Sequence, residues 1–276
     1  MHLPPTMPHW LSFHVHPLET PDAFLARGLK PFLEQYIWST PGARAFFVRQ
    51  EDERGPQIRI RLYGQAEWAR QTLRPAALEW FAARGTVEEA AYVAEPERFG
   101  GPEALKLAEE HFHLSTRVVL ERLNRPYTHG DALFDTLRLD TITAFAAGMI
   151  RLQATRYFGR LCDQWLPLFF RPEGEEVPAD YQMVQAIKDS FDQSLDLQKE
   201  DIKSALDVLW NALADKKFDK QQPEWQRWLR GNELIFKALG DGLEKALPSL
   251  IHLNHNRIGV NNQDEVYLLY VLSQTL

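Results

Sequence analysis

The fold is decided by Gln57-Ile58-Arg59-Ile60-Arg61-Leu62, a stretch in which polar and apolar side chains alternate. Side chains of a β-strand point alternately to its two faces, so Arg59 and Arg61 project together while the apolar residues pack on the opposite side. Residues 45–50 have the same strand composition, and the polar residues 51–56 join the two stretches. Together they predict a β-hairpin.

Two more strands and two helices flank this hairpin. Residues 9–16 alternate, and residues 87–93 also have strand composition. Apolar stripes at helical spacing predict one helix from residue 21 to about 33 and another over 66–84. The resulting order, β-α-β-β-α-β, is that of the split βαβ or ferredoxin-like fold. In it two helices cover one face of a four-stranded sheet, and the first and third strands are central.

The chain after residue 101 has a helical pattern. We expect helices at roughly 102–123, 131–159, 179–213, 222–247, 249–257 and 263–275, with a linker at 171–179. The fold class is therefore α+β: a split βαβ part at 1–100, followed by a mostly helical part at 101–276 that covers the free face of the sheet. We expect the two parts to fold as one cooperative domain with a shared functional site.

Composition and charge exclude several classes of protein. The chain has 276 residues, 45% of them hydrophobic, and a net charge of −7, which opposes nucleic-acid binding through a basic surface. No apolar run approaches the ~20 residues of a membrane helix, and the N-terminus lacks the pattern of a secretory signal. The single cysteine, Cys162, fits a reducing compartment and a role in packing. We expect a cytoplasmic protein without a membrane span or a direct nucleic-acid partner.

The cations of residues 1–100 are ten arginines and one lysine. A guanidinium group binds carboxylates and phosphates in a bidentate manner. Arg59 and Arg61 would therefore form an anion clamp if helices roof their face of the sheet. If they do not, the pair is a solvated surface.

Two other segments carry candidate functional residues. Residues 95–101 follow the fourth strand, where Arg98 could reach over the sheet end and Glu95 could orient an arginine. The alternative is a local surface pair of Glu95 and Arg98. In residues 250–259, His252 and Asn256 share a helix face, with Arg257 beside them. Histidine can move a proton near neutral pH. We expect no metal and no cofactor, because neither a metal-ligand nor a nucleotide motif occurs.

These motifs in this order resemble the C-terminal domain of class I lantibiotic dehydratases, also called the thiopeptide-type bacteriocin biosynthesis domain. The matching motifs are Trp10-x-Ser12-x-His14-Val15, Phe46-Phe47-Val48-Arg49, Ile58-Arg59-Ile60-Arg61, Glu95-x-x-Arg98-Phe99-Gly100-Gly101 and His252-x-x-x-Asn256-Arg257. The chain departs from the family in two places: Gln57 stands where a histidine often precedes the arginine strand, and Gln50 where a tyrosine often follows the first arginine.

The resemblance implies a lyase of peptide natural-product biosynthesis. It would remove glutamate from glutamylated Ser or Thr of a precursor peptide, giving dehydroalanine or dehydrobutyrine. The catalytic residues it implies are Arg59, Arg61, Arg98 and His252, and the expected substrate contacts are Arg49, Tyr92, Glu95, Asn256 and Arg257. The implied partners are the precursor peptide with its leader and a separate tRNA-dependent glutamylating protein, since we expect 276 residues to be too few for a glutamylation domain. A homodimer is left open.

Two other functions remain open. A second branch of the same family, the pyridine synthases, joins two dehydroalanines in a formal [4+2] cycloaddition and expels the leader. A non-catalytic subunit could instead bind a leader peptide along an exposed edge strand. We favour elimination because all four implied residues are present. Whether His252 takes the Cα proton or protonates the leaving group stays undecided.

Overall fold

The computed structural model describes residues 9–123, 127–170, 180–218 and 222–276. The predicted linker at 171–179 lies outside these residues. Two compact units are found: unit 1 comprises residues 1–127 and 241–257, and unit 2 comprises residues 128–240 and 258–276. Unit 1 therefore joins the predicted sheet part to two helices from later in the chain.

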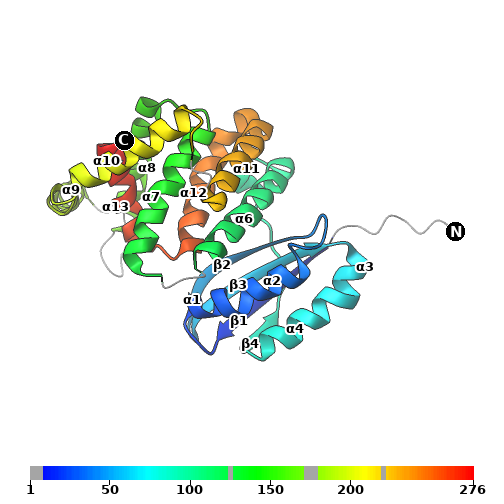
Figure 1. The fold of residues 1–276 in the computed structure, drawn as a ribbon. Helices are drawn as coiled ribbons and strands as arrows, with labels where there is room; N and C mark the ends of the chain where they lie inside the picture. The colour runs from blue at the N-terminus through cyan, green and yellow to red at the C-terminus, as the bar shows by residue number, and fades with distance from the viewer. Residues whose placement is uncertain (1–8, 124–126, 171–179, 219–221) are drawn as a thin grey trace. The chain divides into compact units, whose positions relative to one another are not determined.

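The sheet of unit 1 confirms the predicted fold class. Its strands are β1 (His9–Pro17), β2 (Arg44–Asp52), β3 (Gly55–Gly64) and β4 (Gly85–Glu89), in the antiparallel order β2-β3-β1-β4 (Figure 1). The first and third strands are central, as predicted. The boundaries of the fourth strand, 87–93, were wrong. The strand starts at Gly85, whose backbone lies so close to His16 that an added Cβ would be 2.4 Å from its carbonyl oxygen. It ends at Glu89, before Tyr92 packs against Trp10.

Two helical segments cover one face of the sheet. The first contains α1 (Pro21–Phe24), the π-helical turn η1 (Leu25–Leu29) and α2 (Lys30–Tyr36); the second contains α3 (Ala66–Trp68), the π-helical turn η2 (Ala69–Leu73) and α4 (Arg74–Ala82). Each π turn ends just before a proline, Pro31 or Pro75. A proline ring clashes with the carbonyl four residues earlier, and a wider turn accommodates it. The core is aromatic, with Phe13 and Phe32 both packed on Phe81.

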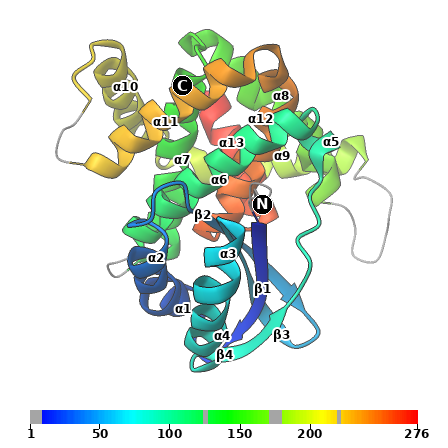
Figure 2. The ribbon, with the colours of Figure 1, turned by 90° about the vertical axis from the view of Figure 1, so that its right-hand side faces the viewer.

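The outer edge of β2 is covered by two helices, α6 (Pro102–Arg122) and α12 (Leu243–Ile258). Figure 2 shows α6 beside β2. The backbone N–H groups of Ala45, Phe47 and Arg49 donate to His113 Nδ1 at 3.1 Å, Thr116 Oγ1 at 3.4 Å and Asn256 Oδ1 at 2.9 Å. These side chains satisfy donors that an exposed edge strand would leave free. The β2 edge is thus closed to an added peptide strand.

The turn into α6 follows the prediction. The short helix α5 (Pro96–Phe99) ends in Gly100 and Gly101, which have φ angles of 104° and 114°. Only glycine adopts such angles without strain. Pro102 then occupies the first position of α6. The rings of Phe99 and Phe112 meet edge-on with their centres 5.5 Å apart, which packs α5 against α6.

Unit 2 is entirely helical in its described residues. Its helices are α7 (His129–Ala146), α8 (Arg151–Phe169), α9 (Tyr181–Asp196), α10 (Lys199–Ala214), α11 (Pro223–Leu239) and α13 (Asn262–Thr275). Cys162 is buried in α8, and burial raises the pKa of its thiol to about 12, in keeping with a packing role. No helix in the described part of the chain is long and apolar enough to cross a membrane.

Several predicted helix boundaries were wrong. The expected helix at 131–159 is two helices, because the chain turns at Gly148 with φ 76°. The expected helix at 222–247 stops at Gly240, with φ 53°. The expected helix at 179–213 is interrupted after Asp196. The short helix predicted at 249–257 is the second half of α12, which continues through Pro248. Apolar periodicity persists across these breaks, so it does not mark them.

Candidate functional site

The second face of the sheet, away from α1–α4, carries the arginine pair. Arg59 is the Cα partner of His14 on β1, and Arg61 is the partner of Ser12. Ile58, Ile60 and Leu62 are fully buried on the other face. The alternation in the sequence therefore places both guanidinium groups on one face, as predicted.

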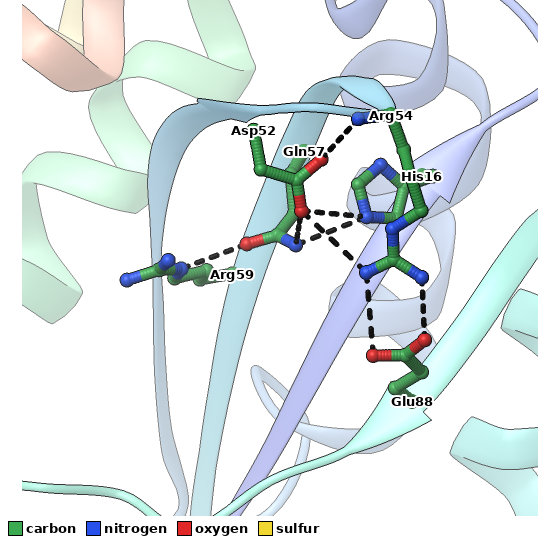
Figure 3. Close-up of polar contacts among 6 residues, drawn as sticks. All are labelled: His16, Asp52, Arg54, Gln57, Arg59 and Glu88. Carbon is green, nitrogen blue, oxygen red and sulfur yellow. Dashed lines mark hydrogen bonds and ion pairs between the residues drawn. The ribbon is translucent and has the colours of Figure 1, made fainter.

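Arg59 is held by a polar network around the β2–β3 turn (Figure 3). Its Nε donates to Gln57 Oε1 at 2.8 Å, and Gln57 Nε2 donates to Asp52 Oδ2 at 3.1 Å. His16 Nε2 lies 3.0 Å from Gln57 Nε2 and 3.3 Å from Asp52 Oδ2. Figure 3 shows the outer end of the Arg59 guanidinium pointing away from this network. One nitrogen fixes the side chain, and the other two remain for an anion.

Arg61 lies half-buried beside Tyr92. Its guanidinium carbon is 5.6 Å from the centre of the Tyr92 ring, and its Nη1 donates to the carbonyl of Ile60 at 3.2 Å. Burial, assisted by the charge of Arg59, lowers the pKa of Arg61 to about 10. Among the described residues no carboxylate forms an ion pair with Arg59 or Arg61. Two adjacent cations without a counter-ion attract an anion, and charge-assisted hydrogen bonds to a carboxylate are available to both.

Arg257 adds a third cation, from α12. It is 0% exposed, and its guanidinium lies 4.6 Å from the Phe112 ring and 5.8 Å from the Phe46 ring. Its Nη1 donates to the carbonyl of Leu253, while Nε and Nη2 are buried without a hydrogen-bond partner. Burial lowers the pKa of Arg257 to about 9, so it stays charged at neutral pH. No carboxylate in the described part of the chain pairs with Arg257, which is unusual for a buried arginine and raises the local positive potential.

An aromatic cluster lines this part of the face. The Trp10 ring contacts those of Phe46 and Tyr92 edge-on and that of Tyr63 at a tilt, with ring centres 5.0–5.3 Å apart. Next to Tyr63 a cavity of about 540 Å³ opens, with Trp68 and Arg44 in its lining. Aromatic walls beside cations suit an extended peptide with apolar side chains.

Arg98 contacts α12. Its Nε donates to Ser249 Oγ at 2.9 Å, and its Nη1 is 3.7 Å from Glu95 Oε2. Glu95 is 69% exposed. The local pair of Glu95 and Arg98 therefore exists, and Arg98 additionally ties α5 to α12. Its polar contacts do not extend to Arg59 or Arg61.

One face of α12 carries His252 between two of these contacts. Ser249, His252 and Asn256 are spaced by three and four residues, which places them on the same side of a helix. Asn256 Oδ1 accepts from the backbone N–H of Arg49 and its Nδ2 donates to the carbonyl of Arg49, both at 2.9 Å. Arg49 Nε also donates to the carbonyl of Arg257 at 2.9 Å, and Arg49 pairs with Asp22 at 2.6 Å. Arg49 and Asn256 thus fasten β2 to α12.

The structure therefore groups the predicted residues in two sets. Arg61 and Arg257 contact the aromatic cluster that includes Tyr92, and Arg59 lies beside Arg61 on β3. Arg49, Glu95, Arg98 and Asn256 lie instead on or next to one face of α12. His252 lies half-buried on that helix face. All nine residues belong to unit 1. The described residues contain no group of three or more His, Cys, Asp or Glu that could hold a metal ion.

Two functional candidates were missed from the sequence. Glu109 on α6 is 7% exposed and accepts a hydrogen bond from Tyr92 Oη at 2.9 Å. Burial raises the pKa of Glu109, and also that of Tyr92. His14 stands in one of the matching motifs but was given no role, although it faces Arg59 directly. Only strand register could have marked His14, and nothing in the sequence marks Glu109.

Comparison with protein families identifies the chain. Residues 10–276 match the model of the lantibiotic biosynthesis dehydratase C-terminal family. The chain belongs to this family. The predicted resemblance is thereby confirmed. Proteins with this lantibiotic dehydratase C-terminal fold take part in the biosynthesis of ribosomally made peptide natural products. No curated protein matches the chain.

Three solved structures share the fold of this dehydratase C-terminal family member. TbtD, a pyridine synthase from thiomuracin biosynthesis, has a TM-score of 0.76 at 16% identity, covering 96% of this chain and 97% of TbtD. TsrL has a TM-score of 0.68 at 15% identity, covering 98% and 94%. The tRNA-dependent lantibiotic dehydratase MibB from Microbispora sp. 107891 has a TM-score of 0.55 at 19% identity. The match to MibB covers 96% of this chain but 28% of MibB.

Proposed function

We propose that this protein is a lyase that eliminates glutamate from glutamylated Ser or Thr residues of a precursor peptide, leaving dehydroalanine or dehydrobutyrine. The observation that carries the proposal is the pair of Arg59 and Arg61. Their guanidinium groups share one sheet face, and neither is paired with a carboxylate of the described residues. Such a pair fits a substrate that carries a carboxylate and releases one.

β-Elimination requires three things of the protein: a base for the Cα proton, donors for charge on the neighbouring amide oxygen, and stabilisation of the departing carboxylate. Arg59 and Arg61 hold the glutamyl group. Their charge-assisted hydrogen bonds strengthen as the ester oxygen gains negative charge, so they stabilise the transition state more than the bound substrate. The buried positive charge of Arg257 also stabilises the negative charge that develops in the transition state.

His252 is the proton carrier on α12, and Arg98, held by Ser249 of the same helix, adds a further positive charge on the substrate side. The residues proposed to build the substrate-binding wall around them are Arg49, Tyr92, Glu95, Asn256 and Arg257, of which the fully buried Arg257 acts through its charge. Since Asn256 uses both atoms of its amide on the backbone of Arg49, its part is to hold the site wall in place. Replacing His252 with alanine should make glutamylated peptide accumulate, as seen by mass.

Glutamate must be attached by another protein or domain. The match to MibB, a tRNA-dependent dehydratase, covers 28% of that protein. Elimination consumes a peptide that already carries glutamate, so we propose that a separate tRNA-dependent partner glutamylates the peptide. A precursor peptide with a leader and a cytoplasmic location belong to the same proposal.

A second candidate is a pyridine synthase that performs a [4+2] cycloaddition. It is favoured by the match to TbtD, which covers nearly all of both chains. A cycloaddition of two neutral dehydroalanines has less need of unpaired arginines, and we therefore rank it second.

One experiment separates these functions. The purified protein is incubated with a glutamylated precursor peptide and, separately, with a peptide that already carries dehydroalanines, and masses are recorded. Loss of glutamate from the first peptide supports elimination. Loss of the leader from the second supports cycloaddition, and binding without any mass change supports a leader-binding subunit.

A further inference from the structure

His14 lies at the centre of the polar sheet face. On one side its Cα partner is Arg59 of β3, and on the other it is Glu88 of β4. Residues directly opposite in antiparallel strands have Cβ atoms about 4.5–5.5 Å apart. Arg61, the next outward-facing residue of β3, is diagonal to His14. The imidazole therefore stands beside both guanidinium groups of the proposed anion site.

The His14 side chain is not used by the surrounding network. Its Nε2 is buried without a hydrogen-bond partner. In contrast, His16, two residues along the same face, is engaged by Asp52 and Gln57. Glu88, the one carboxylate opposite His14, is held by Arg54, whose Nη1 lies 2.5 Å from Glu88 Oε1. Among the described residues, His14 Nε2 therefore has no hydrogen bond that would give it a structural role.

Its surroundings keep His14 neutral. Burial is the largest cause that lowers the pKa of His14, followed by the charges of Arg61 and Arg59; His16 acts in the same direction and Glu88 opposes them. A neutral imidazole can accept a proton at neutral pH. When a substrate carboxylate binds the two arginines, it offsets their charge. The imidazole then becomes more basic once substrate is bound.

We propose that His14 is the base that removes the Cα proton of the glutamylated residue. This inference rests on the elimination function proposed above and assigns the base that the sequence left undecided. The Cα–H electron pair forms the Cα=Cβ bond, the Cβ–O bond breaks, and its electrons leave with the carboxylate of glutamate. The proton passes to the imidazole of His14 and later to water. His252, on α12, then serves the leaving-group side of the reaction.

The test uses the full chain and a glutamylated precursor peptide, with release of glutamate as the readout. His14→Ala should lower the rate about 100-fold or more, as general-base removal does, and added imidazole should restore part of it. His14→Gln has a side chain of similar shape and should fold like the wild type, which a matching melting curve would show. A lowered rate in this variant then reflects the loss of the base and not a folding defect. His129→Gln, in unit 2, should leave the rate unchanged.

The pH dependence separates a base from a structural residue. The wild-type rate should fall at acidic pH as His14 becomes protonated. His14→Gln should lose this acid limb, while His252→Ala should be slower but retain it. A rate for His14→Ala near that of the wild type would overturn the role of His14 as the base. A lowered rate that imidazole does not restore, together with an intact acid limb in His14→Gln, would overturn it too. Neither result would affect the elimination function itself. A wild-type protein that releases no glutamate overturns both the inference and the elimination function.

Discussion

The arginine pair of β3 illustrates how local pattern and environment together define a site. Arg59 is oriented by Gln57, and Arg61 by the Tyr92 ring and a backbone carbonyl. The side chain of Gln57 is an amide, which accepts this hydrogen bond from Arg59 without titrating. The orientation of Arg59 should therefore not change with pH through residue 57.

Replacing Arg61 tests its role in transition-state stabilisation. Arg61→Ala should reduce the rate of glutamate release about 100-fold, equivalent to roughly 3 kcal/mol. Arg61→Lys should recover only part of it, because an ammonium group cannot make a bidentate contact. Arg70→Ala, an exposed arginine on the helical side, is the control and should behave like the wild type. Equal rates for all variants would remove Arg61 from the mechanism.

Glu109, which accepts the hydrogen bond of Tyr92, should make the free energy of unfolding depend on pH. Its pKa is raised by burial, so the folded state binds a proton more readily than the unfolded state. The free energy of unfolding contributed by Glu109 should thus increase as pH falls from 7 towards 4.5. Glu109→Gln should remove this increase, as measured by urea unfolding at several pH values. Glu103→Gln, an exposed control, should retain it.

The sequence predicts which residues share a face of β3 but not how deeply they are buried. Alternation alone places Arg59 and Arg61 together. The full burial of Arg257 depends on α6 and α12 meeting at β2, which no local pattern specifies. The importance of His14 likewise depends on its pairing with Arg59, 45 residues later in the chain.

At the scale of elements, hydrogen bonds at the edge of β2 hold α12 in place beside the sheet. Asn256→Ala removes two hydrogen bonds to the backbone of Arg49 and leaves a buried donor and acceptor unpaired. It should lower the free energy of unfolding by about 2 kcal/mol. Asn211→Ala, on an exposed face of α10, should change it by less than about 0.5 kcal/mol. Equal stabilities in urea unfolding would show that α12 is not fastened at this point.

Strands and helix caps of the sheet part were predictable because their signals are local. Thr20 and Pro21 start α1, and Thr20 Oγ1 accepts from Ala23 as a helix cap. The extent of β4 was not predictable, because it depends on how far β1 extends beside it and on where Tyr92 finds its aromatic partners. Helix ends at Gly148 and Gly240 require positive φ angles that periodicity does not reveal.

At the scale of the whole molecule, the distribution of charge is more informative than its sum. The chain has a net charge of −7, yet the cations of its first 100 residues are ten arginines and a single lysine. Every predicted site residue lies in unit 1, including those from α12. Cooperative folding of the parts 1–100 and 101–276 stays a prediction. The compact unit that contains the sheet, unit 1, also contains two helices from beyond residue 100, α6 and α12.

The most direct test of the elimination function is a single-turnover measurement with isotope-labelled glutamate on the precursor peptide. The wild type should release one labelled glutamate for each dehydrated Ser or Thr formed, and Arg59→Ala/Arg61→Ala should release almost none while still binding the peptide. Retention of the label by the wild-type reaction, or undiminished release by the double variant, would contradict the account.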